Sequence, residues 1–353
     1  MNKKKWLLLG GGIVGLLSVL LVKFGNPANM GFCIACFIRD MAGSVGIHNA
    51  EVVQYMRPEI IGLVSGAFIM ALLKKDFIPK GGSSPVIRFL LGFCVMVGAL
   101  IFLGCPLRMA LRLAAGDLNA VIGLIGFIVG IITGVIFLKK GFSLGRNYRQ
   151  KAPEGFAITG VNLVFLALLV FFPSLLIFSE KGPGSMHAPI IMSLAAGLIV
   201  GAIAQRTRLC MVGGIRDVIL FKDWTLLMGF IGIIIVALIG NIALGFFNPG
   251  FAGQPVAHTD GLFNFLGMTA VGLGSVMLGG CPLRQLILTG EGNTDSAIAV
   301  IGMFVGAAFC HNFKLASSPD GTTPAGRIAC ITVIILMLII AFSYTYTKKK
   351  EVK

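Results

Sequence analysis

Ten long apolar segments dominate the sequence and limit what the chain can fold into. An α-helix needs about 20 apolar residues to cross a hydrocarbon core about 30 Å thick. Only 12% of the residues are charged and the mean hydropathy is +0.94, whereas about 25% are charged in soluble globular chains. The sequence therefore predicts an all-α integral membrane protein with crossings at residues 6–24, 58–73, 86–103, 119–138, 156–178, 188–205, 225–247, 263–279, 296–312 and 327–347.

Four shorter apolar segments lie between these crossings, around residues 31–46, 105–116, 208–221 and 281–290. Each is too short to cross a bilayer and is interrupted by charged residues, Gly or Pro. Broken backbone at membrane depth is tolerated only where it is buried in protein or lines a wet cavity. We therefore interpret these segments as four re-entrant half-helices.

The two halves of the chain carry the same motifs. Gly-Cys-Pro-Leu-Arg occurs at 104–108 and at 280–284, and a second motif, which starts with Cys and ends in Arg-Asp, occurs at 33–40 and 210–217. Each half also has five predicted crossings, so the second half must be inserted upside down. The sequence thus predicts two inverted repeats, 1–180 and 181–353, in one membrane domain, with half-helices that meet near the midplane.

Basic residues predict the orientation of the chain. Lys and Arg cluster around 3–5, 74–80, 139–151, 206–208 and 348–350, whereas the loop 248–262 has none. Because cytoplasmic loops carry the excess of Lys and Arg, we expect a multi-pass protein of the cell (inner) membrane with both termini cytoplasmic. The formal charge of +15 also suits an interior that attracts anions.

Arginine is an unusual residue at membrane depth, where its charge costs at least about 2.5–3.5 kcal/mol and often marks a pathway or a partner. Arg39 and Arg216 are each followed directly by an aspartate. This favours a local ion pair, although both remain candidates for the substrate pathway.

Arg108 and Arg284 belong to the repeated Gly-Cys-Pro-Leu-Arg motif and have no adjacent acid. We therefore expect them to attract an anion along the pathway. Glu291 and Asp295 follow Arg284 closely, and either would neutralise its charge.

Cysteines stand at the start of the predicted half-helices. Cys105 and Cys281 each precede a proline, which is favoured at the first helical position. A helix N-terminus suits an anion and favours the thiolate, and soft sulfur can meet another chalcogen atom. Cys33 and Cys210 occupy matched positions in the other two half-helices. We expect Cys105 and Cys281 to face each other across the narrowest point of the pathway.

Cys36 completes a Cys-x-x-Cys motif with Cys33, but Gly213 stands at the matching position of the second half. This motif leaves open a membrane thiol oxidoreductase that uses Cys33 and Cys36. Thiolates also select soft metals, so a soft-metal transporter is another alternative, although the neighbouring arginines argue against a cation. We predict no resident metal and no cofactor.

The paired motifs and the duplication resemble the YeeE/YedE family of membrane transporters, over essentially the whole chain. The resemblance implies uptake of thiosulfate and related sulfur compounds through an hourglass of inverted half-helices. It also implies that Cys33, Cys105 and Cys281 hand the anion along by S–H···S contacts. Residues 31–48 and 104–117 look closest to a branch associated with selenium metabolism.

These features together predict an importer of a small sulfur- or selenium-containing species rather than an enzyme. No Gly-x-x-x-x-Gly-Lys-Ser/Thr nucleotide-binding loop occurs in the sequence. Facilitated passage, with a cytoplasmic sulfur- or selenium-carrier protein as a possible recipient, is the expected mechanism.

Overall fold

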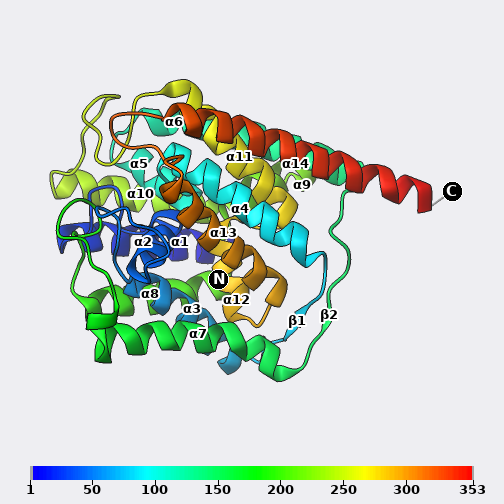
Figure 1. Cartoon of the computed structure of the whole chain (residues 1–353), viewed down its shortest axis with the longest axis horizontal. Helices are drawn as coiled ribbons and strands as arrows, with labels where there is room; N and C mark the ends of the chain where they lie inside the picture. The colour runs from blue at the N-terminus through cyan, green and yellow to red at the C-terminus, as the bar shows by residue number, and fades with distance from the viewer. Residues whose placement is uncertain (1–2, 352–353) are drawn as a thin grey trace.

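The fold is a bundle of α-helices, which the computed structural model describes for residues 3–351 (Figure 1). The apolar segments form helices because a helix pairs its own backbone polar groups, as lipid requires. Ten of the helices in this range have sixteen or more residues: α1 (Lys3–Lys23), α3 (Pro58–Leu73), α4 (Pro85–Phe102), α6 (Asn119–Lys139), α7 (Ala152–Phe171), α8 (Ile190–Thr207), α10 (Leu227–Ala243), α11 (Gly261–Leu278), α13 (Thr294–Asn312) and α14 (Pro324–Glu351).

Four short helices coincide with the predicted half-helices: α2 (Ile34–Ser44), α5 (Pro106–Ala114), α9 (Met211–Phe221) and α12 (Pro282–Gly290). The remaining elements are the two-residue strands β1 (Lys80–Gly81) and β2 (Tyr148–Arg149), which pair antiparallel, and the 3₁₀ turn η1 (Pro173–Leu175). The order of long and short helices from α1 to α7 recurs from α8 to α14.

The prediction of an all-α integral membrane protein is confirmed. Within residues 3–351, eight segments are long and apolar enough to cross a membrane by length and composition. The predicted crossings at 58–73 and 225–247 correspond to α3 and α10, which have 16 and 17 residues and are shorter than a typical crossing.

The long helices pack in pairs that combine one helix from each half of the chain. α3 packs on α8, α1 on α10, α6 on α11 and α4 on α13, and α4 also packs on α11. Glycine is frequent in these helices, and small residues allow membrane helices to approach closely. The half-helices lie inside this arrangement, where α2 contacts α12 and α5 contacts α9.

The last helix of each half occupies a different environment. α7 packs on α3, α12 and α13, whereas α14 packs on α4 and α11. Figure 1 shows α7 and α14 along opposite edges of the bundle. This difference could not be predicted from the sequence, because a similar Pro-x-Gly motif, at 153–155 and 324–326, stands at the start of both helices.

Loops from both halves meet at each end of the bundle. At one end Lys80 pairs with Arg149 in the β1–β2 sheet and also bridges to Asn293. At the other end Asp117 bridges to Gly250. The C-terminal part of α14 lies on the same side as β1 and β2 (Figure 1).

Candidate functional site

Two half-helices begin directly after a cysteine whose sulfur caps the helix. Cys33 precedes α2 and Cys210 precedes α9, and each Sγ accepts the N–H of the residue three positions on, Cys36 or Gly213, at 3.3 Å. The first N–H groups of a helix have no partner within the helix and carry partial positive charge. Both sulfurs therefore lie where negative charge is favoured.

The other two half-helices begin at a Cys-Pro pair. α5 follows Cys105 and α12 follows Cys281, and proline takes the first helical position in both. Leu103 and Gly279 adopt the left-handed backbone conformation just before these cysteines. This conformation ends α4 and α11 and turns the chain into the half-helix, which is why the repeated motif lies at a helix break.

Three of the four thiols of the first half, those of Cys33, Cys36 and Cys105, are grouped around the N-termini of α2 and α5. The N–H of Ile34 donates to Cys105 Sγ at 3.2 Å, and the Cys36 N–H donates to Cys33 Sγ. Arg108 Nη1 lies 3.7 Å from Cys36 Sγ. All three thiols are buried, so the first-half group is enclosed by protein.

Two of the four thiols of the second half form a closer pair. Cys210 Sγ and Cys281 Sγ are 3.8 Å apart, which joins the start of α9 to the start of α12. We expected Cys281 to face Cys105, but the sulfur partner that the structure gives Cys281 is from its own half. Sequence alone did not reveal this pairing, because it depends on how two half-helices 71 residues apart dock together.

A cavity of about 900 Å³, here called the vestibule, leads toward this thiol pair. Cys210 and Gly213 are part of its lining, and Cys281 lies behind Cys210, almost fully buried. The charged lining side chains are six basic and four acidic ones: Lys3, Lys80, Arg206, Arg208, Arg216, Arg284, Asp76, Asp217, Asp223 and Glu291. This excess of basic groups attracts small anions.

Two predicted pathway arginines line the vestibule as members of ion pairs. Arg284 Nη1 lies 3.1 Å from Glu291 Oε1, and Arg216 Nη2 lies 2.8 Å from Asp217 Oδ1. All four side chains are partly exposed to the cavity. Glu291 is thus the acid that neutralises Arg284, whereas Asp295 pairs with Arg88.

Arg108 is fully buried and has a different set of partners. Its guanidinium donates to backbone carbonyl oxygens of Asn29 at 3.2 Å and Val256 at 3.1 Å, and also to that of Leu103. The charge is therefore solvated by carbonyl dipoles. In this structure these donors bind protein oxygens rather than an open anion site.

Arg39 forms the predicted local pair, and a second arginine joins it. Arg39 Nη2 and Arg57 Nη2 each lie 2.7 Å from a carboxylate oxygen of Asp40, and Arg57 also stacks over the rings of Phe37 and Tyr55. Sequence analysis missed Arg57 because it lies 17 residues from Asp40. The network fixes α2 against the loop before α3.

Arg112 is a second buried arginine that sequence analysis missed. Its Nε lies 2.6 Å from Asp117 Oδ2, with both side chains fully buried, and its guanidinium stacks 4.2 Å from the centre of the Phe102 ring. Arg and Asp five residues apart were the available signal, but the second half has Leu288 and Asn293 at the matching positions. The duplication therefore did not highlight them.

His48 borders the Arg39–Asp40 pair from the loop after α2. Its Nε2 lies 3.0 Å from the carbonyl oxygen of Arg39, and its ring stacks on His311. Burial lowers the pKa of His48 below its ordinary value, so the ring is neutral at pH 7 and adds no charge beside Arg39.

The opposite end of the molecule is much tighter than the vestibule. One cavity there, beside Asn29 and Gly31, measures about 10 Å³, which is room for about one water molecule. Another, beside Tyr55 and His187, measures about 250 Å³. Within residues 3–351, no three His, Cys, Asp or Glu side chains come together as a metal site.

The fold and this site define an all-α, multi-pass membrane protein with paired thiols beside a charged cavity. Residues 206–352 match the family model described as Sulphur transport. Over these residues the chain is similar to the sulphur-transport family, which agrees with the YeeE/YedE resemblance of the paired motifs. The first Gly-Cys-Pro-Leu-Arg motif lies outside the matched residues, and the second lies inside them.

Two relatives are named as transporters. The chain is 30% identical to the thiosulfate transporter TsuA of Escherichia coli strain K12 over 123 residues, 35% of this chain and 34% of that protein. It is 33% identical to the thiosulfate transporter TsuA of Spirochaeta thermophila over 122 residues, 32% of this chain and 34% of that protein. The matches therefore span about a third of each relative.

Proposed function

We propose that the protein imports a small sulfur- or selenium-containing anion across the inner membrane. The Cys210–Cys281 pair behind the vestibule is the observation that carries this proposal. A soft chalcogen atom hydrates weakly and can exchange contacts with a thiol, while the helix N-termini replace part of the water around the oxyanion. The names of the two relatives favour thiosulfate among such anions.

The proposed pathway runs between the two thiol groups. The anion contacts Cys36, Cys33 and Cys105 of the first half, passes on to Cys281 and Cys210, and leaves through the vestibule. The contacts of α2 with α12 and of α5 with α9 support a continuous route between the halves.

Arginines shape the field along this route. Arg216 and Arg284 attract the anion in the vestibule, and their paired acids keep it from binding too tightly. Arg108 and Arg39 add positive charge around the first-half thiols, which lie next to Arg108.

We further propose that residues 1–180 and 181–353 are inverted repeats, and that the vestibule opens to the cytoplasm. The recurring helix order and the pairing of α1 with α10 and α3 with α8 support the repeat. The basic residues at the vestibule end support a cytoplasmic position for both termini. A cytoplasmic sulfur- or selenium-carrier protein would receive the anion at the vestibule.

Uptake of radiolabelled thiosulfate and selenite by cells that lack other importers tests the proposal. We expect Cys105→Ser and Cys281→Ser each to lose most uptake at equal membrane expression, because a hydroxyl is smaller and harder than a thiol. Cys330→Ser is the control, because Cys330 is buried against Ile101 and Phe263, away from the half-helices.

Other outcomes would point to the alternatives. Wild-type uptake by the Cys105→Ser, Cys281→Ser double variant would reject the thiol pathway. A strict requirement for Cys33 and Cys36, with Cys281 dispensable, would favour a thiol oxidoreductase. Uptake of copper(I) but of neither anion would favour a soft-metal transporter.

A further inference from the structure

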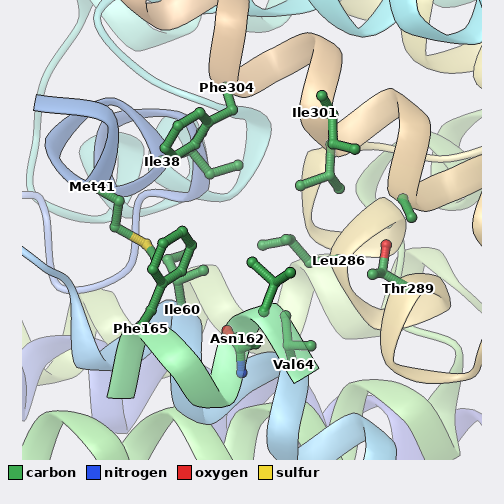
Figure 2. Close-up of a pocket in the computed structure, with 13 residues that line it drawn as sticks. Ile38, Met41, Ile60, Val64, Asn162, Phe165, Leu286, Thr289, Ile301 and Phe304 are labelled. Atoms are coloured by element: carbon green, nitrogen blue, oxygen red, sulfur yellow. The ribbon is translucent and has the colours of Figure 1, made fainter. Parts of the chain in front are cut away.

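Another cavity, here called the apolar pocket, lies between α7 and the rest of the bundle. Its volume is about 210 Å³, and five helices, α2, α3, α7, α12 and α13, supply its walls. Figure 2 shows Met41 and Phe165 on one side of the pocket and Leu286 and Thr289 on the opposite side. The pocket plays no part in the thiol pathway described above.

The lining of the apolar pocket excludes water. Eleven of its thirteen residues are aliphatic or aromatic residues or methionine. The two polar ones bond to protein: the Asn162 amide donates to the carbonyl oxygen of Ile61, and the Thr289 hydroxyl donates to that of Gln285. Apolar cavities of about 150 Å³ stay dry yet accept apolar molecules, so an occupant of this larger pocket must be hydrocarbon.

The pocket is continuous with the surface that faces lipid. Val161 on α7 and Ile301 on α13 belong to its lining and are 48% and 45% exposed. The pocket extends inward to Met41 and Leu286, which are 4% and 2% exposed. In a membrane protein, exposed valine and isoleucine on two neighbouring helices contact acyl chains, so the bilayer itself supplies hydrocarbon at the entrance.

We propose that the apolar pocket binds an acyl chain of a bilayer phospholipid, which enters between α7 and α13. The bound chain contacts α2, the half-helix that starts at Cys33, and α12, the half-helix that starts at Cys281. It thus packs between half-helices from the two halves of the protein and supports their contact.

Photolabelling of the wild-type protein tests this binding site. The protein is reconstituted in vesicles of phosphatidylcholine with a diazirine near the end of one acyl chain, irradiated and digested, and the adducts are mapped by mass spectrometry. We expect adducts on Met41, which is too buried to meet bulk lipid. Ile191, 84% exposed on α8, is the positive control, and Phe37, fully buried on α2 outside the pocket, is the background.

A pocket-filling variant sharpens the test. Ala297 lines the pocket from α13, so Ala297→Phe should reduce labelling of Met41 to the Phe37 background and leave Ile191 unchanged. Val305→Phe, on a lipid-exposed position of α13 outside the pocket, is the matched control and should retain Met41 labelling. Val64→Phe fills the pocket from α3 if Ala297→Phe fails to fold.

Two results would overturn the proposal. One is background labelling of Met41 in the wild-type protein while Ile191 is labelled. The other is undiminished Met41 labelling in a folded pocket-filling variant, because the label would then reach α2 by another route.

Discussion

At the scale of single residues, the sulfur atoms occupy two unequal environments. The first-half thiols are enclosed, whereas Cys210 and Cys281 form a pair next to a wet cavity. Access for water-soluble reagents therefore differs between the groups, although all eight cysteines are classed as buried. This difference follows from the vestibule and could not be predicted from motifs that the two halves share.

Mild oxidation should form a disulfide between Cys210 and Cys281. With the water-soluble disulfide reagent 4,4′-dithiodipyridine, we expect a Cys210–Cys281 disulfide, formed as one thiolate displaces thiopyridone from the mixed disulfide on the other. Peptide mapping by mass spectrometry detects the link, and Cys210→Ser should abolish it. Cross-linking of Cys210 to Cys105 instead would contradict the pairing described here.

The buried Arg112–Asp117 pair should matter for stability. Removing one partner of a buried ion pair costs about 3–5 kcal/mol, because the other charge is left without compensation. We expect Arg112→Met to lower the thermal unfolding midpoint of the purified protein, and Arg112→Met with Asp117→Asn to recover much of the loss. A double variant that unfolds earlier than Arg112→Met would show that Asp117 has a separate role, for instance through its bonds to Asn119.

At the scale of helices, sequence patterns predicted most elements, and the exceptions have physical causes. The predicted crossing 58–73 has the same bounds as α3. The crossing predicted at 156–178 instead ends at Phe171, because Pro173 cannot continue a helix and begins η1. The short apolar length and the Cys-Pro signals were sufficient to predict the half-helices, since these features act locally.

Long-range pairing was the part that sequence could not provide. The Asp40–Arg57 and Cys210–Cys281 contacts arise only when separate helices dock. The different neighbours of α7 and α14 likewise depend on competition for packing surfaces. The sequence could not predict this difference, because both helices are similar apolar segments.

Close packing between the halves predicts which glycines resist substitution. A Cβ on Gly126 would lie 2.1 Å from the carbonyl oxygen of Phe265, and one on Gly302 would lie 2.1 Å from that of Phe89. Both contacts are with backbone, so α6 would have to move from α11, and α13 from α4. We expect Gly126→Ala and Gly302→Ala each to destabilise the protein by about 1–3 kcal/mol, as overpacking does.

Gly160 on α7 provides the matched control for this measurement. A Cβ there meets no atom within 4 Å, so Gly160→Ala should leave the thermal midpoint unchanged or raise it slightly, because alanine favours the helix. Equal midpoint losses in all three variants would mean that helix spacing is not what the two packed glycines protect.

At the scale of the whole molecule, labelling from each side of the membrane tests the predicted orientation. We expect cysteines introduced at Lys3 and Lys140 to react with a membrane-impermeant maleimide only from the cytoplasm. Cysteines at Lys181 and Lys314 should react only from outside. All four positions are exposed, and each variant also carries Cys210→Ser, because Cys210 lines the vestibule. The other native cysteines are buried, so the introduced thiols dominate the signal. Labelling of Lys140 and Lys314 positions from one side would exclude five crossings in each half.

The unequal packing of α7 and α14 has a consequence for the kinetics of transport. If two inverted repeats packed identically, the states open to either side would be degenerate in free energy. Here α7 covers α12 and α13 while α14 covers α4 and α11, and the cavities described at the two ends differ in volume, about 900 Å³ at one and about 250 and 10 Å³ at the other. The degeneracy is therefore lifted. For the proposed transport, we expect the anion to exchange quickly with the wide end and to wait for a rarer opening at the other. Forward and reverse rates would then differ in their limiting step, although the overall equilibrium is unchanged.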